Sequence, residues 1–80
     1  MSFMFEVIYR APADTEKEKQ IASLISSYGG MLDCREEPDL NGINSVVLTY
    51  EFQDYDQAYA AASRLREQGL KVDGPYDYGP

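Results

Sequence analysis

Residues 45–52 read Ser-Val-Val-Leu-Thr-Tyr-Glu-Phe and carry the strongest strand pattern in the chain. β-branched and aromatic residues dominate the segment, as is typical of a half-buried strand. Side chains alternate between the two faces of a strand, so the segment divides into an apolar set and a mixed set. The apolar set is Val46, Leu48, Tyr50 and Phe52, and the mixed set is Val47, Thr49 and Glu51. The first face is therefore predicted to cover the core.

Two further strands are predicted before this one. Residues 2–10 alternate in the same way, with Phe3, Phe5, Val7 and Tyr9 on one face and Met4, Glu6, Ile8 and Arg10 on the other. Residues 31–37 are more polar. They place Leu32 and Cys34 on one face and Asp33, Arg35 and Glu37 on the other, which indicates a sheet edge. The Asn41-Gly42 pair tolerates positive φ, so strands 31–37 and 45–52 are expected to form a hairpin.

A first helix is predicted between the first two strands. Asp14 or Thr15 can cap it, and Thr15 with Glu18 fits the spacing of a capping box. Ile21, Leu24, Ile25 and Tyr28 then form one apolar stripe. The Gly29-Gly30 pair is expected to end the helix.

A second helix and a last strand follow residue 53. Asp54 is the expected cap, with Gln57 at the reciprocal position. The helix stripe consists of Ala58, Ala61, Ala62 and Leu65, and Gly69 is the expected end. Residues 70–72 begin a short strand that Gly74-Pro75 is predicted to interrupt, and residues 76–80 either extend along the sheet or lie loose.

The order strand, helix, strand, strand, helix, strand resembles the ferredoxin-like α+β sandwich over residues 1–80, taken as a single domain. That resemblance implies a four-stranded antiparallel sheet with two helices on one face. It also implies that the first and third strands are central and the second and fourth are edges. A superfold of this kind carries many functions, so the resemblance alone assigns none.

Composition removes most catalytic chemistry from consideration. The 80 residues include no histidine and one cysteine, so a Cys–His nucleophile, an intramolecular disulfide and a cysteine-based metal cage cannot form. Cys34 is expected to be a buried packing residue beside Leu32. The first residues lack the pattern of a signal peptide and no segment approaches the length of a membrane span. A non-enzymatic, cytoplasmic protein without cofactor or membrane contact is expected.

The chain lacks the signatures of several families that share this topology. Acylphosphatases use an arginine and an asparagine, to which Arg10 and Asn41 or Asn44 are superficially comparable, but residues 11–13, Ala-Pro-Ala, replace the glycine-rich phosphate loop. RNA-recognition domains need a basic signature, whereas the net charge here is −7, which disfavours nucleic acid. Metal chaperones of this fold need two cysteines, and residues 39–42 lack the ligand spacing of an EF-hand. No metal site is predicted.

The negative charge is concentrated in residues 33–56, where seven acids stand against Arg35 alone. The acids are Asp33, Glu36, Glu37, Asp39, Glu51, Asp54 and Asp56. One explanation is structural, because edge charges prevent aggregation and acids stabilise helix starts. The other is functional, since a clustered charge selects and steers a partner. Small acidic inhibitors of nucleic-acid-binding machinery, including some anti-CRISPR and anti-restriction proteins, resemble this chain in size and charge only.

The resulting hypothesis is a protein-binding module, an inhibitor or adaptor, that presents these seven residues to a basic protein surface. The alternative is a dimeric, small-molecule-sensing module similar to ACT domains, paired through a sheet face that includes Met4, Ile8 and Val47. Either class could use exposed tyrosines as contact anchors. The candidates are Tyr55, Tyr59, Tyr76 and Tyr78.

Overall fold

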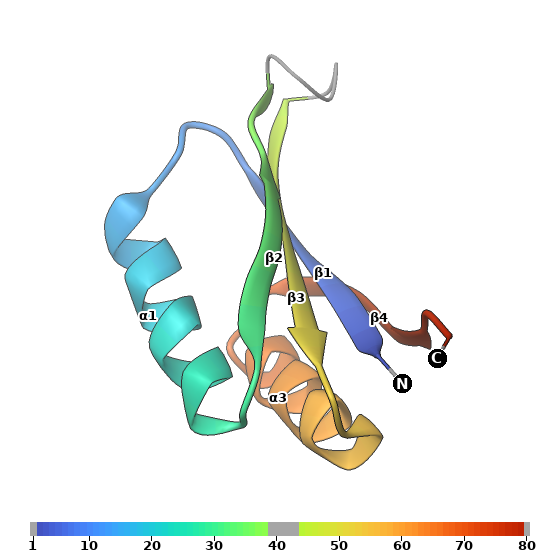
Figure 1. The fold of residues 1–80 in the computed structure, drawn as a ribbon. Coiled ribbons are helices and arrows are strands. Elements are labelled where there is room, and N and C mark those ends of the chain that lie inside the picture. Colours follow the sequence, from blue (N-terminus) through green and yellow to red (C-terminus); the bar gives the residue numbers. More distant parts are fainter. Residues whose placement is uncertain (1, 39–43, 80) are drawn as a thin grey trace.

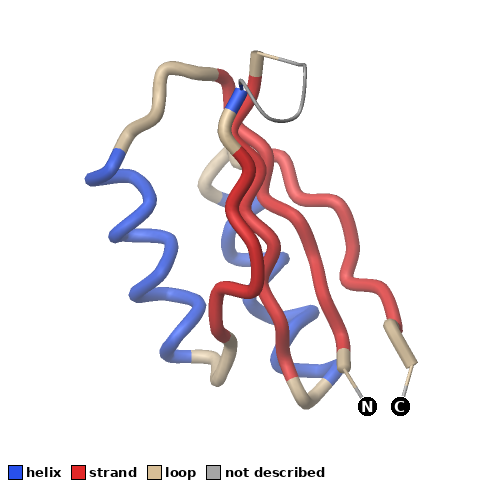
Figure 2. Tube along the Cα trace, turned by 45° about the horizontal axis from the view of Figure 1, so that its top comes forward, coloured by secondary structure: helices blue, strands red, loops and turns tan. Residues whose placement is uncertain are grey.

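The computed structural model describes residues 2–38 and 44–79. Its elements are β1 (Phe3–Arg10), α1 (Thr15–Ser27), β2 (Met31–Glu36), β3 (Ser45–Phe52), α3 (Tyr55–Glu67) and β4 (Lys71–Asp77). The strands form one antiparallel sheet in the order β2-β3-β1-β4, and both helices lie on the same side of it (Figure 1, Figure 2). The predicted ferredoxin-like α+β fold is confirmed, with β1 and β3 central and β2 and β4 at the edges.

The core lies between the sheet and the helices and follows the predicted alternation. The buried strand residues are Phe5, Val7, Tyr9, Val46, Leu48, Tyr50 and Phe52, and the buried helix residues are Ile21, Ile25, Ala58, Ala61, Ala62 and Leu65. Three of the four alanines of α3, Ala58, Ala61 and Ala62, are completely buried. Their small side chains let α3 lie close to the sheet, so the sequence pattern of this helix predicted its packing correctly.

The start of α1 resolves the choice between two caps. Asp14 is the cap, because its carboxylate accepts a hydrogen bond from the Lys17 backbone amide at 3.0 Å. The capping box predicted for Thr15 and Glu18 is wrong. The Glu18 carboxylate binds Arg35 of β2 instead, so a tertiary ion pair replaces the local capping bond.

The other helix ends agree with the sequence. Asp54 caps α3 by accepting from the Gln57 backbone amide at 3.0 Å. Gly29 and Gly69 follow the two helices with φ of 81° and 87°. That left-handed conformation is natural for glycine and costly for other residues, so both glycines are effective helix ends.

The pairing of β2 with β3 contains a bulge. Leu32 pairs with Tyr50 and Cys34 pairs with Thr49, so two steps along β2 match one step along β3. Asp33 is the extra residue. A bulge of this kind reverses the alternation of every side chain beyond it.

The bulge corrects two predictions about β2. Leu32 and Cys34 lie on opposite faces, so the prediction that Cys34 is buried beside Leu32 is wrong, and Cys34 is exposed. Arg35, which now lies opposite Leu48, projects toward the helices, where it meets Glu18. A strict alternation from the sequence could not reveal this reversal, because the extra residue is visible only in the register with β3.

The exposure of Cys34 can be tested by thiol labelling. In the native protein, Cys34 is expected to react with a thiol reagent at a rate within about tenfold of that of the unfolded chain, since access is open. A matched control is Val46→Cys in a Cys34→Ser background, because Val46 is completely buried. Protection of native Cys34 by about a thousandfold would contradict the bulge, because a buried thiol reacts only through unfolding.

The last strand also differs from its prediction. β4 is continuous through Gly74-Pro75, so the predicted interruption is wrong. The register with β1 shifts between Met4 and Glu6, and this irregularity accommodates the Gly-Pro pair. Gly74 has φ of 116°, and a Cβ there would lie 3.0 Å from the Met4 carbonyl oxygen. Beyond the strand, the Tyr78 amide donates to the Ser2 carbonyl at 2.9 Å, so the tail extends along the sheet.

Candidate functional site

The predicted acidic residues spread along the whole sheet. Glu36 pairs with Val47 near the start of β3, and Glu51 pairs with Met31 four positions further along, about 13 Å away. Asp54 and Asp56 lie beyond the end of β3, at the start of α3. The structure thus places the described acids at three levels of the molecule.

The remaining members of the predicted set do not join one patch either. Asp33 is exposed at the bulge of β2. Glu37 accepts a hydrogen bond from Arg35 Nη1 at 2.7 Å, so its charge is paired. Asp39 and the Asn41-Gly42 turn lie outside the described residues. Of the seven, Glu36 and Glu51 share the sheet face that the helices leave uncovered.

This uncovered face, here called the open face, combines apolar and acidic side chains. The strand register places on it Met4, Glu6, Ile8, Arg10, Met31, Cys34, Glu36, Ser45, Val47, Thr49, Glu51, Lys71, Asp73 and Tyr76. Met4 and Ile8 are partly exposed and Val47 is 7% exposed, so the centre of the face is apolar. The expectation that Met4, Ile8 and Val47 share a face without helices is confirmed.

The charges on the open face are unevenly distributed. Arg10 lies at one end, opposite Ser45, and Lys71 lies opposite Ile8, two residues from Asp73 on the same strand and face. The other half, here called the acidic half, carries Glu6, Glu51 and Asp73, and among the described strand residues Lys71 is the one cation that neighbours it.

Glu6 and Asp73 are directly opposite each other on β1 and β4. Like charges in this position destabilise a sheet. Asp73 accepts a hydrogen bond from the Tyr76 hydroxyl at 2.5 Å. Arg66 of α3 reaches the same edge but donates to the carbonyls of Val72 and Gly74. The sequence did not single out Glu6 or Asp73, because they lie far apart in the chain and outside residues 33–56.

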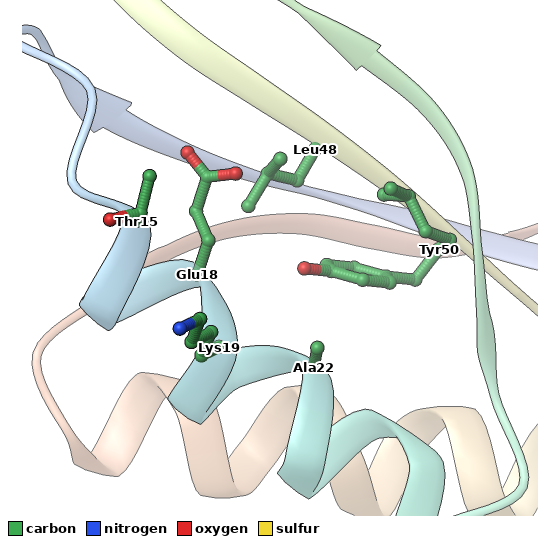
Figure 3. A pocket seen from close by; sticks show the side chains of 7 residues that line it. Thr15, Glu18, Lys19, Ala22, Leu48 and Tyr50 are labelled. Atoms are coloured by element: carbon green, nitrogen blue, oxygen red, sulfur yellow. The ribbon is translucent and has the colours of Figure 1, made fainter.

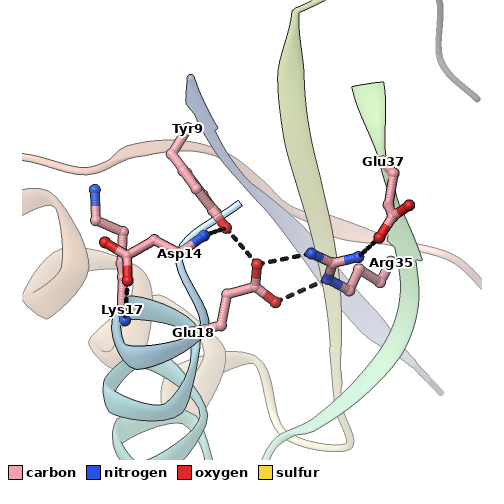
Figure 4. A network of polar contacts seen from close by, with 6 residues as sticks. All are labelled: Tyr9, Asp14, Lys17, Glu18, Arg35 and Glu37. Atoms are coloured by element: carbon pink, nitrogen blue, oxygen red, sulfur yellow. Dashed lines mark hydrogen bonds and ion pairs between the residues drawn. The ribbon is translucent and has the colours of Figure 1, made fainter. Parts of the chain in front are cut away.

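A second polar feature ties α1 to the sheet (Figure 4). The Glu18 carboxylate accepts from Arg35 Nε at 2.8 Å and from Arg35 Nη2 at 3.0 Å, and it also accepts from the Tyr9 hydroxyl. The Tyr9 oxygen in turn accepts from the Asp14 backbone amide at 2.9 Å. This network, here called the Glu18 network, therefore joins β1, the start of α1 and β2.

The network shifts the ionisation of its members. The guanidinium of Arg35 is the main cause of the lowered pKa of Glu18. Burial is the main cause of the raised pKa of Tyr9, and its hydrogen bond to Glu18 adds to it. Glu18 is therefore charged and Tyr9 neutral at pH 7, as a fixed structural link requires.

A groove of about 290 Å³ lies beside this network, between α1 and the sheet (Figure 3). It is lined by Thr15, Glu18, Lys19, Ala22, Leu32, Leu48 and Tyr50. Leu48 and Tyr50 are almost completely buried, whereas Leu32 is 51% exposed. The groove is therefore an apolar depression with a polar rim, and the sequence could not predict it because it depends on how α1 is placed beside β2.

Other chemistry receives little support from the described residues. Among residues 2–38 and 44–79, no group of three or more histidine, cysteine or acidic side chains is arranged to hold a metal ion. Neither described helix has the length and apolarity that crossing a bilayer requires.

The predicted exposure of four tyrosines is confirmed, at 45%, 55%, 52% and 58% for Tyr55, Tyr59, Tyr76 and Tyr78. They do not form one group. Tyr55 contacts Phe3 and Tyr59 on the helix side, whereas Tyr76 lies opposite Met4 on the open face.

Comparison of the chain with protein families, curated proteins and solved structures gave no match. Its function is therefore argued from its own geometry.

Proposed function

We propose that the protein is a non-enzymatic binding module, an inhibitor or adaptor, that presents its open face to a basic surface of another protein. The observation that carries the proposal is the acidic half, where Glu51 lies opposite Met4 and Glu6 lies opposite Asp73, so that acids outnumber the one neighbouring strand cation, Lys71. A contact with an apolar centre and a charged surround is typical of protein interfaces. The site differs from the set expected from sequence, since it includes Glu6 and Asp73 and leaves out the acids of α3.

The opposed pair of Glu6 and Asp73 strengthens this proposal. Local rules of stability are most often broken where a protein has a functional need. A lysine or arginine of a partner placed between the two carboxylates would turn their repulsion into two favourable charge contacts. A cytoplasmic setting is part of the proposal, because a chain with one cysteine has no internal disulfide.

A triple variant, Glu6→Gln, Glu51→Gln and Asp73→Asn, tests the role of the acidic half. Proteins retained at low salt on the immobilised wild-type chain would first be identified, and the association rate of each measured. The variant is expected to associate about tenfold more slowly with a true partner and to show a weaker dependence on salt, because electrostatic steering is reduced. Its free energy of unfolding should be unchanged or slightly higher, since a like-charge pair is removed.

The matched control changes the same number of charges on the helices. Glu16, Asp56 and Glu67 are exposed helix residues, and their neutral variants alter the net charge equally. If both triple variants slow association to the same extent, overall charge is responsible and the acidic half has no special role. An unchanged rate in the open-face variant would remove the proposal.

Pairing of two copies through the open face is the second candidate, favoured by the apolar side chains of Met4, Ile8 and Val47. A symmetric dimer brings the same surface of each copy together. The acidic halves of the two copies would repel each other if they lay face to face. Added salt screens this repulsion, so the dimer contact should strengthen with salt. Sedimentation at low and high salt separates the two candidates, because binding to a basic partner weakens with salt.

A further inference from the structure

The groove between α1 and the sheet contains a hydrogen-bonding group that has no partner among residues 2–38 and 44–79. Tyr50 is 2% exposed, and its hydroxyl is turned toward α1, among the side chains of the groove (Figure 3). It makes no hydrogen bond to any part of the chain that the structure describes. No buried side-chain oxygen or nitrogen of the described residues lacks a hydrogen-bond partner, so the Tyr50 hydroxyl is open to the groove, where water or a ligand can bind it. The other core tyrosine is satisfied within the protein, since the Tyr9 hydroxyl has two partners.

The state of the Tyr50 hydroxyl defines what it can bind. Burial is the main cause that raises the pKa of Tyr50 to about 12, and the nearby charge of Glu18 adds to it. The phenol is therefore protonated at neutral pH and can donate a hydrogen bond into the groove. A ligand for this site needs an acceptor oxygen at that point.

The walls of the groove suit a small apolar body. Leu32, Leu48 and Ala22 line it, and its volume of about 290 Å³ lies near the lower end for small-molecule pockets, roughly 300 Å³. A cavity of about 150 Å³ is sufficient to hold benzene. One ring with a short substituent therefore matches the available space.

The rim adds a charge preference. Lys19 lines the groove, is exposed, and makes no ion pair with the described residues. Glu18 also lines it, but its carboxylate is paired with Arg35, which offsets part of its charge. An unpaired cation beside an unpaired donor favours an anionic acceptor.

We propose that this groove binds a small apolar carboxylate, about one ring in size, whose oxygens accept a hydrogen bond from Tyr50 and pair with Lys19. The site lies on the helix side of the sheet. It is therefore separate from the open face, and either assignment can fail without the other.

Titration of the full chain with benzoate, followed by amide and methyl NMR shifts, tests the site. Shifts are expected at the groove residues, with a dissociation constant of about 1 mM for a ligand of this size. Tyr50→Phe, which removes only the hydroxyl, should weaken binding about three- to tenfold. Lys19→Gln should weaken it about two- to fivefold. Benzamide, which has the same shape without the charge, should bind more weakly than benzoate.

Two variants of α1 provide the control. Ala22→Leu fills the groove and should abolish binding, whereas Ser23→Leu adds the same side chain at an exposed position that does not line it. The proposal is overturned if 10 mM benzoate, about ten times the expected constant, leaves the groove residues unshifted. It is also overturned if Tyr50→Phe or Ala22→Leu binds as well as the wild type, or if benzamide binds equally well.

Discussion

Gly30→Ala is expected to lower the free energy of unfolding by about 1–3 kcal/mol, because the added methyl group has no space. A Cβ at Gly30 would lie 2.5 Å from the Phe52 ring atoms Cε2 and Cζ and 2.8 Å from Ile25 Cγ2. Both neighbours are 1% exposed and packed in the core, so neither can move without disturbing others. Denaturant unfolding of the variant measures the loss directly.

A double-mutant cycle identifies the cause. Phe52→Leu removes the ring atoms that the new methyl group meets, so Gly30→Ala should cost about 1 kcal/mol less in that background. Gly29→Ala is the matched control, because a Cβ there meets nothing within 4 Å and only its φ of 81° is unfavourable. Its cost, about 1–2 kcal/mol, should not depend on residue 52. Equal behaviour of the two glycines in the cycle would contradict the close contact with Phe52.

Glu18→Gln is expected to lower the free energy of unfolding at pH 7 by about 1–3 kcal/mol, since a charged acceptor with several hydrogen bonds is lost. The Glu18 side chain is 17% exposed, so water screens the network only in part. Glu16→Gln changes an exposed acid of the same helix turn and should cost less than about 1 kcal/mol.

The effect of Glu18→Gln should depend on pH. Folding lowers the pKa of Glu18 below its usual 4.5, so the native state favours the charged form more than the unfolded chain does. The stabilisation is therefore complete above that value and is lost as the pH falls through the native pKa. Wild type and variant should become nearly equal in stability at low pH, where both side chains are neutral. A difference that stays constant from pH 7 to pH 3 would show that the charge of Glu18 contributes nothing.

A candidate site could be predicted from the sequence only where it depends on residues that are close together in the chain. Met4, Ile8 and Val47 were assigned to an open face from alternation within single strands, and their register confirms it. The pairing of Glu6 with Asp73 depends on the alignment of the first and last strands, which no local pattern contains. The groove depends on the space between α1 and β2, which is likewise a tertiary property.

The sequence by itself determined the order of elements, the apolar faces of β1 and β3, the helix stripes and the glycines that end the helices. All of these depend on periods of 2 or 3.6 residues and on backbone preferences, which act over a few neighbouring positions. The tertiary structure alone decided the bulge at Asp33, and with it the exposure of Cys34 and the ion pair of Arg35 with Glu18. The physical reason is that a bulge adds one residue to one strand, and the added residue moves every later side chain of that strand to the opposite face. Whether and where such a residue is added is decided by contacts between distant segments of the chain.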